Sequence, residues 1–131
     1  MNDNWHRVGI QALRAPFLLV AVVAVLVGSA AAYNDGVYRW DVFIITLVAA
    51  VAVHAGTNVW NDYFDHVFKA DDYHLHPTPF SGGSRVIQEG KMSPGAVLWL
   101  AIACYAVAIA ACVWLVCLSG WLLIAFGLAG L

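Results

Sequence analysis

Residues 42–65, VFIITLVAAVAVHAGTNVWNDYFD, begin as an uncharged apolar run and end in a cluster of polar and acidic side chains. The apolar part, residues 42–60, is close to the roughly 20 residues that an α-helix needs to cross a bilayer. Two further runs without Lys, Arg, Asp or Glu occupy residues 16–33 and 95–118. We therefore predict three membrane-spanning helices.

The composition supports a membrane protein. Of the 131 residues, 63% are hydrophobic and 11% are charged, whereas soluble domains have roughly 45–50% and about 25%. The net charge is −2 and no basic run is present, so nucleic acid is not an expected partner. The cysteines at positions 104, 112 and 117 match neither a metal-binding nor a disulfide pattern, and we interpret them as packing residues.

The last and the first apolar runs of the chain each have a second interpretation. Residues 121–131 follow the Ser119–Gly120 turn and are too few to cross a bilayer. We expect them to start a fourth span, and we expect the chain to be the N-terminal portion of a larger bundle. The first run imitates a signal peptide, because arginines precede it and small residues end it. The two spans that follow favour a membrane helix, since small residues also serve helix packing.

The basic residues predict the orientation. Five of the six lysines and arginines flank the same side of the predicted spans, and only Arg39 lies on the other side. By the positive-inside rule, the N-terminus and the loop 61–94 are cytoplasmic. This loop is too long and too apolar for a plain connector. Within it we expect a short helix at 86–91, before a helix start at Ser93–Pro94.

Two other features of the loop have competing interpretations. Residues 81–85, SGGSR, offer backbone N–H groups to a phosphate or form a plain turn. His66, His74 and His76 have no accompanying cysteine and no finger-like spacing, so zinc is not expected.

A polar stripe marks the end of the second span. His54, Asn58, Asp62 and Asp65 recur every three or four residues and therefore share one face of a helix. Ionisable groups at the bilayer edge are costly unless they face a bundle interior or a water-filled cavity. The stripe is therefore predicted to line a pocket.

The stripe also predicts a metal site. Asn58, Asp62 and Asp65 offer oxygen ligands of the kind that Mg²⁺ prefers when phosphate oxygens complete its coordination. In the plain alternative these residues only cap the helix end. Acidic residues at a helix C-terminus oppose the macrodipole, however, and no lysine follows until Lys69, which favours a bound cation. Lys69, Arg85 and Lys91 are available for the phosphates.

These residues carry a family resemblance. Residues 58–65, NVWNDYFD, resemble the first Asp-rich motif of the UbiA superfamily of membrane prenyltransferases. Residues 78–94 resemble the loop of the branch that prenylates 1,4-dihydroxy-2-naphthoate in menaquinone biosynthesis, and residues 13–16 and 27–30 are similar to the first helix of the family. The resemblance implies an all-α integral membrane bundle of about nine spans, of which about 3.5 are present.

The resemblance further implies an activity. A prenyltransferase of this kind uses Mg²⁺ to transfer an isoprenyl chain from a prenyl diphosphate to an aromatic quinone precursor, at the inner membrane of the cell. The implied roles are catalysis for Asp62 and Asp65, metal binding for Asn58, Asp62 and Asp65, and diphosphate binding for Asn58, Asn61, Lys69 and Arg85. The second Asp-rich motif is missing, so these 131 residues alone are expected to be inactive.

Two other functions share parts of this pattern. The first is a transporter or channel fragment with an ion site at Asn58, Asp62 and Asp65, but these charges lie at the predicted membrane edge rather than at its midplane. The second is a CDP-alcohol phosphotransferase, whose pattern needs a glycine and an alanine–arginine pair between its aspartates, whereas only Tyr63 and Phe64 lie between Asp62 and Asp65.

Overall fold

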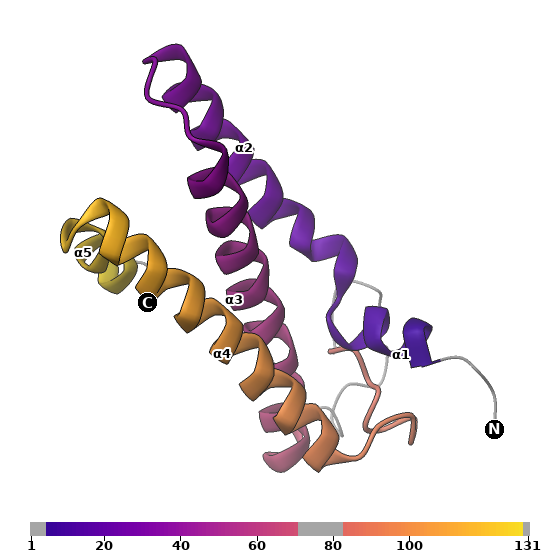
Figure 1. Cartoon of the computed structure of the whole chain (residues 1–131). Coiled ribbons are helices and arrows are strands. Elements are labelled where there is room, and N and C mark those ends of the chain that lie inside the picture. The colour runs from indigo at the N-terminus through magenta and orange to yellow at the C-terminus, as the bar shows by residue number, and fades with distance from the viewer. Residues whose placement is uncertain (1–4, 71–82, 130–131) are drawn as a thin grey trace.

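The computed structural model describes residues 5–70 and 83–129, and within these ranges it contains helices and no strands. In chain order the elements are α1 (Trp5–Ala12), the 3-10 turn η1 (Ala15–Phe17), α2 (Leu18–Asn34), α3 (Trp40–Val67), α4 (Pro94–Ser119) and α5 (Leu122–Ala129). Figure 1 shows how they are arranged. The expected all-α class is confirmed.

Three helical segments are long and apolar enough to cross a membrane: Ala15–Asn34, α3 and α4. The first and third agree closely with the predicted spans. The second is longer than predicted, because α3 has 28 residues and continues to Val67. At 1.5 Å per residue this is about 42 Å, which exceeds the roughly 30 Å of a hydrocarbon core. The polar stripe therefore lies on helix, and the connecting segment begins at Phe68 rather than at Asn61.

The start of α4 follows the expected signal. The Ser93 hydroxyl accepts a hydrogen bond from the amide of Ala96 at 3.2 Å, and Pro94 occupies the first turn of the helix. The short helix expected at 86–91 was wrong, since these residues form turns. The amides of both Lys91 and Met92 donate to the carbonyl of Val86, and the positive φ of Gly90 (66°) ends any helical continuation.

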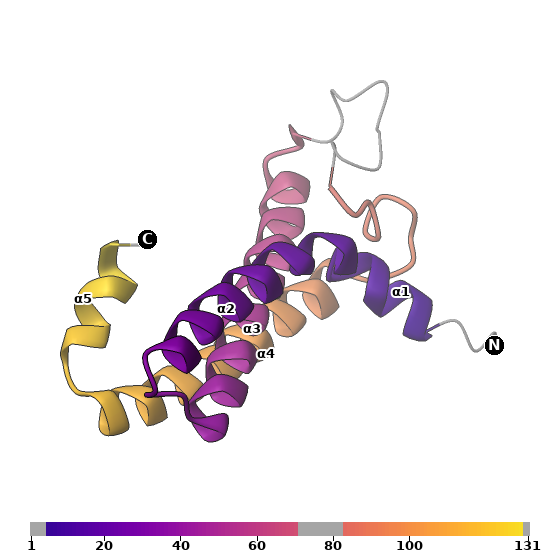
Figure 2. The same cartoon turned by 90° about the horizontal axis from the view of Figure 1, so that it is seen from above.

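Helices α2 and α3 run antiparallel, and α4 crosses α3 and packs along it (Figure 1). Helix α1 and the segment 83–92 lie at the C-terminal end of α3, as Figure 2 shows from above. A buried apolar cluster joins these parts, and its members are Ala12, Val59, Val86, Ile87, Val97 and Ala101. A second cluster of Ala49, Ala111 and Leu115 lies elsewhere along α3 and α4. The first cluster fixes the surroundings of the polar stripe.

Candidate functional site

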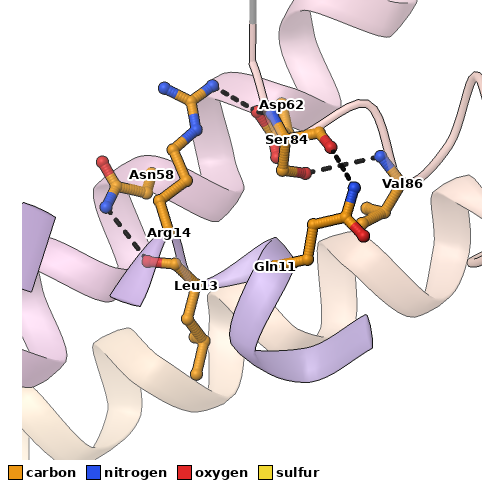
Figure 3. A network of polar contacts seen from close by, with 7 residues as sticks. All are labelled: Gln11, Leu13, Arg14, Asn58, Asp62, Ser84 and Val86. Atoms are coloured by element: carbon orange, nitrogen blue, oxygen red, sulfur yellow. Dashed lines mark hydrogen bonds and ion pairs between the residues drawn. The ribbon is translucent and has the colours of Figure 1, made fainter. Parts of the chain in front are cut away.

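Asp62 is the centre of a polar network drawn in Figure 3. Its side chain is only 5% exposed. One carboxylate oxygen, Oδ1, accepts hydrogen bonds from the Arg14 guanidinium at 2.6 Å and from the backbone N–H of Ser84 at 3.0 Å. Arg14 lies between α1 and η1, and Ser84 lies in the segment that precedes α4. Three distant parts of the chain therefore meet at one carboxylate.

The link that carries Arg14 is held by local backbone contacts. The Arg14 amide donates to the carbonyl of Gln11, and the Arg14 carbonyl accepts from the amide of Phe17. On either side, Ala12 is fully buried and Leu13 packs against the same apolar cluster as Val59 of α3. These contacts hold the Arg14 backbone over the end of α3.

Asn58 lies one helical turn before Asp62 and binds the same link. Its side-chain amide donates to the carbonyl of Leu13 at 3.2 Å. The contact uses the amide nitrogen and leaves the amide oxygen, the atom that can bind a metal, out of this bond. Asn58 and Asp62 therefore both face the segment between α1 and η1, as their helical spacing predicts.

Gln11 ties helix α1 to the segment 83–92. Its side-chain amide donates to the carbonyl of Ser84 at 2.8 Å and to the carboxylate of Glu89 at 3.2 Å, and its amide oxygen accepts from Lys91 at 2.8 Å. Lys91 and Glu89 form an ion pair at 2.5 Å. The hydrogen bonds from Lys91 and Gln11 lower the pKa of the Glu89 carboxyl. Through these bonds Gln11 positions the Ser84 amide against Asp62.

Three buried polar atoms, two in the network and one on Arg85, which follows Ser84 in the chain, have no hydrogen-bond partner in the described part of the chain. They are Oδ2 of Asp62, Nε of Arg14 and Nη1 of Arg85. Buried polar groups in proteins are nearly always paired, so each exception needs an explanation. The unpaired set combines one carboxylate oxygen, which suits a cation, with two guanidinium nitrogens, which suit an anion.

The backbone is unusual at the same place. Arg14 (φ 51°), Lys69 (φ 56°) and Arg85 (φ 59°) are the non-glycine residues with positive φ in the described ranges, and all three are basic. A left-handed backbone costs a non-glycine residue roughly 1–3 kcal/mol and tends to occur at functional sites. Lys69 directly follows Phe68, the C-cap of α3. The strained positions therefore lie on segments adjoining the site.

The predicted site residues are only partly brought together. Asn58 and Asp62 belong to the network, and Arg85 follows Ser84 directly. Asp65 is half-buried, whereas Asn61 and Lys69 are exposed, and the described residues include no hydrogen-bond or ion-pair partner for these three side chains. Nor do the described residues contain a group of three His, Cys, Asp or Glu side chains placed to hold a metal. His74, His76 and residues 81–82 of the glycine-containing stretch lie outside the described ranges.

The sequence has no lysine close to the aspartates before Lys69, which predicted that a cation compensates them. In the structure Arg14, 48 residues away, supplies a positive charge to Asp62. Nothing in the sequence indicated the role of Gln11, and for the backbone N–H of Ser84 the sequence indicated a phosphate or a plain turn rather than Asp62. The available signal was an arginine two residues before Pro16 at the start of the first apolar run, which places a cation at the same membrane edge as the acidic stripe.

Comparison with known proteins gives two matches. The model of the UbiA prenyltransferase family matches residues 21–131. A 61-residue segment is 43% identical to the 2-carboxy-1,4-naphthoquinone phytyltransferase of Synechocystis sp. (strain ATCC 27184 / PCC 6803 / Kazusa). That segment is 46% of this chain but spans only 20% of the relative. No solved structure gives a significant match.

Proposed function

Because this chain belongs to the UbiA prenyltransferase family, we propose that it carries the first metal and diphosphate site of a membrane enzyme that prenylates a quinone precursor. The proposed reaction is Mg²⁺-dependent transfer of an isoprenyl chain from a prenyl diphosphate to an aromatic acceptor such as 1,4-dihydroxy-2-naphthoate. The phytyltransferase relative, named for a naphthoquinone, supports an acceptor of that class. The proposed location is the inner membrane, with the N-terminus and the site cytoplasmic.

The observation that carries the proposal is the Oδ2 atom of Asp62, which is buried and has no partner within residues 5–70 and 83–129. A carboxylate oxygen that is buried at the end of a spanning helix fits a divalent cation, since hard cations take oxygen ligands. Asp65 on the next turn and the amide oxygen of Asn58 on the preceding turn supply further oxygen ligands. The residues present therefore fit Mg²⁺.

The chain's own residues have distinct roles in this proposal. Asn58, Asp62 and Asp65 hold the cation, which offsets the charge of the departing diphosphate when bound. Arg85, with its unpaired Nη1, binds phosphate oxygens, and Asn61 and Lys69 contribute from the exposed side of the site. The backbone N–H of Ser84 orients the Asp62 carboxylate by binding Oδ1.

An apolar groove supports binding of the isoprenyl chain. It has a volume of about 560 Å³ and lies between α3 and α4 beside the start of α2. Its lining residues include Leu13, Leu18, Val51, Ala55 and Val107. Leu13 is also the residue whose carbonyl binds Asn58. The groove therefore adjoins the polar network, as a substrate with a charged head and an apolar tail requires.

The test is Mg²⁺-dependent binding of radiolabelled geranylgeranyl diphosphate by the chain in lipid nanodiscs. We expect Asp62→Asn to abolish the Mg²⁺-dependent part of the binding. The matched control is Asp41→Asn, which removes an exposed aspartate at the opposite end of α3 that is also paired with an arginine. Binding of the prenyl diphosphate that does not depend on Mg²⁺, or that Asp62→Asn leaves unchanged, would contradict the proposal. A transporter or channel site would instead bind the cation without regard to the diphosphate.

A further inference from the structure

We infer that Arg14 is an exchangeable counterion: Asp62 binds Arg14 when no ligand is present, then exchanges it for the divalent cation, and the released guanidinium binds the diphosphate. This inference rests on the proposed function and adds a residue and a switch to its site. Among the described residues, Arg14 is the cation that contacts Asp62. The pair therefore blocks part of the proposed metal site.

The geometry of the pair is incomplete. Arg14 contacts only Oδ1 of Asp62, through one terminal nitrogen, and leaves Oδ2 and its own Nε buried without partners among the residues that the structure describes. A stable arginine–carboxylate pair is commonly bidentate, with two parallel hydrogen bonds. Burial of a charged pair is compensated only when the remaining donors and acceptors are satisfied. The Arg14–Asp62 ion pair is therefore weaker than a fully satisfied buried pair. A weak pair is what replacement of Arg14 by a divalent cation requires.

The two partners differ in how firmly they are held. Asp62 lies on a spanning helix, and its Oδ1 keeps the Ser84 amide as a second donor when the guanidinium leaves. Arg14 lies in the short link between α1 and η1, with a left-handed backbone at φ 51°. The backbone of the link is held in place, but the long Arg14 side chain, which is 23% exposed, leaves the carboxylate by rotation about its own bonds. The arginine is therefore the partner that moves.

The experiment measures Mn²⁺ binding, as a paramagnetic substitute for Mg²⁺, by loss of the free-ion EPR signal from the whole chain in nanodiscs. We expect Arg14→Gln to raise the affinity for Mn²⁺ alone by about tenfold, since it removes a competitor worth one charge-assisted hydrogen bond. Inorganic pyrophosphate should strengthen Mn²⁺ binding by the wild type but much less by Arg14→Gln. Arg14→Lys should partly restore the pyrophosphate effect.

Arg39→Gln is the matched control, because Arg39 forms an ion pair with Asp41 at the far end of α3. It should change neither measurement. A second readout uses the wild type and so does not depend on a variant that folds. Phenylglyoxal modification of Arg14, followed by mass spectrometry, should accelerate when Mn²⁺ is added and slow again when pyrophosphate is added with it.

Unchanged or weaker Mn²⁺ binding by a folded Arg14→Gln variant would overturn the inference, as would an Arg14 modification rate that ignores bound Mn²⁺. Absence of Mn²⁺ binding in every variant would overturn it as well. The proposed function fails separately: Mn²⁺ exchange at Arg14 without any binding of prenyl diphosphate would support the counterion and refute the prenyl substrate.

Discussion

Asp62 and Asp65 lie one turn apart on α3 but differ in their surroundings. Asp62 is buried and accepts hydrogen bonds from Arg14 and Ser84, so its replacement disturbs both the fold and the proposed metal site. Asp65 is half-buried, and its side chain has no hydrogen-bond partner in the described ranges. Asp65 is therefore the cleaner probe of the metal site.

We expect Asp65→Asn to weaken Mg²⁺-dependent binding of geranylgeranyl diphosphate by at least about tenfold, because a metal ligand loses its charge. Where prenyl transfer is measurable, its rate should fall by orders of magnitude. Thermal stability, followed by circular dichroism in nanodiscs, should change by less than about 0.5 kcal/mol, as for substitutions outside a contact network. The control is Asp35→Asn in the exposed turn after α2. If Asp65→Asn bound the diphosphate as well as the wild type does, Asp65 would be excluded as a ligand of Mg²⁺.

At the scale of elements, close packing of α3 against α4 supports the site. Gly56 allows this approach: a Cβ atom there would lie 3.2 Å from Cβ of Cys104 and 3.4 Å from the Tyr105 ring. The atom on Cys104 is attached directly to the α4 backbone, so the helix itself would have to move. Small residues at such crossings are the usual means of helix association in membranes.

Gly56→Ala should therefore destabilise the helix pair relative to Gly28→Ala. Both changes add a helix-favouring methyl group, but nothing lies within 4 Å of a Cβ at Gly28. The overpacking at Gly56 is expected to cost about 1–3 kcal/mol. Comparison of the two thermal midpoints in the same detergent tests this. Equal thermal midpoints would mean that α4 shifts at the crossing without loss of stability.

Helix α1 is attached to the segment 83–92 in part through the Glu89 carboxylate. Gln11 and Lys91 both donate to this carboxylate and hold its pKa below the ordinary value of 4.5. A group whose pKa is lowered by folding contributes stability above its unfolded pKa and loses it as pH falls through the folded pKa. The attachment is therefore complete at neutral pH and weakens in acid.

We expect amide-exchange protection of α1, corrected for intrinsic rates, to stay constant from pH 7 to about 5 and to fall below pH 4.5. Glu89→Gln should reduce the protection at neutral pH and remove most of this acid-dependent change. A pH profile of Glu89→Gln identical to that of the wild type would show that other groups hold α1.

At the scale of the whole molecule, the surface is largely apolar. Helix α2 has no buried residue, and large apolar side chains on α2, α3 and α4 are exposed. Such a surface must be covered by lipid or by further helices. The charged residues of the site lie at one end of this apolar body, which together with family membership makes the chain an integral membrane protein.

The orientation of this body in the membrane is testable with single cysteines, after the native ones at 104, 112 and 117 are replaced by alanine. In intact cells we expect an impermeant maleimide to label Asn34→Cys but not His66→Cys, because the basic flanks predict that the end of α3 is cytoplasmic. Both positions are exposed. Inverted vesicles should give the opposite pattern, and labelling of His66→Cys in intact cells would reverse the topology.

The local sequence pattern was sufficient to predict the spans, the shared face of the polar stripe and the start of α4. The three spans follow from the length of uncharged runs, and the shared face of Asn58 and Asp62 follows from the helical period, since both depend only on neighbouring residues. The N-cap at Ser93 has the same local cause. The length of α3 was underestimated because hydropathy reports where the membrane ends and not where the helix ends.

The surroundings of Asp62 could not be predicted in this way. Its partners Arg14 and Ser84 are 48 and 22 residues away, and no periodic pattern relates such positions. They meet because Ala12 and Val86 share one buried cluster with Val59, and the backbone next to both segments is left-handed, at Arg14 and at Arg85. The partner of a buried charge depends on packing between distant segments, which local sequence does not encode.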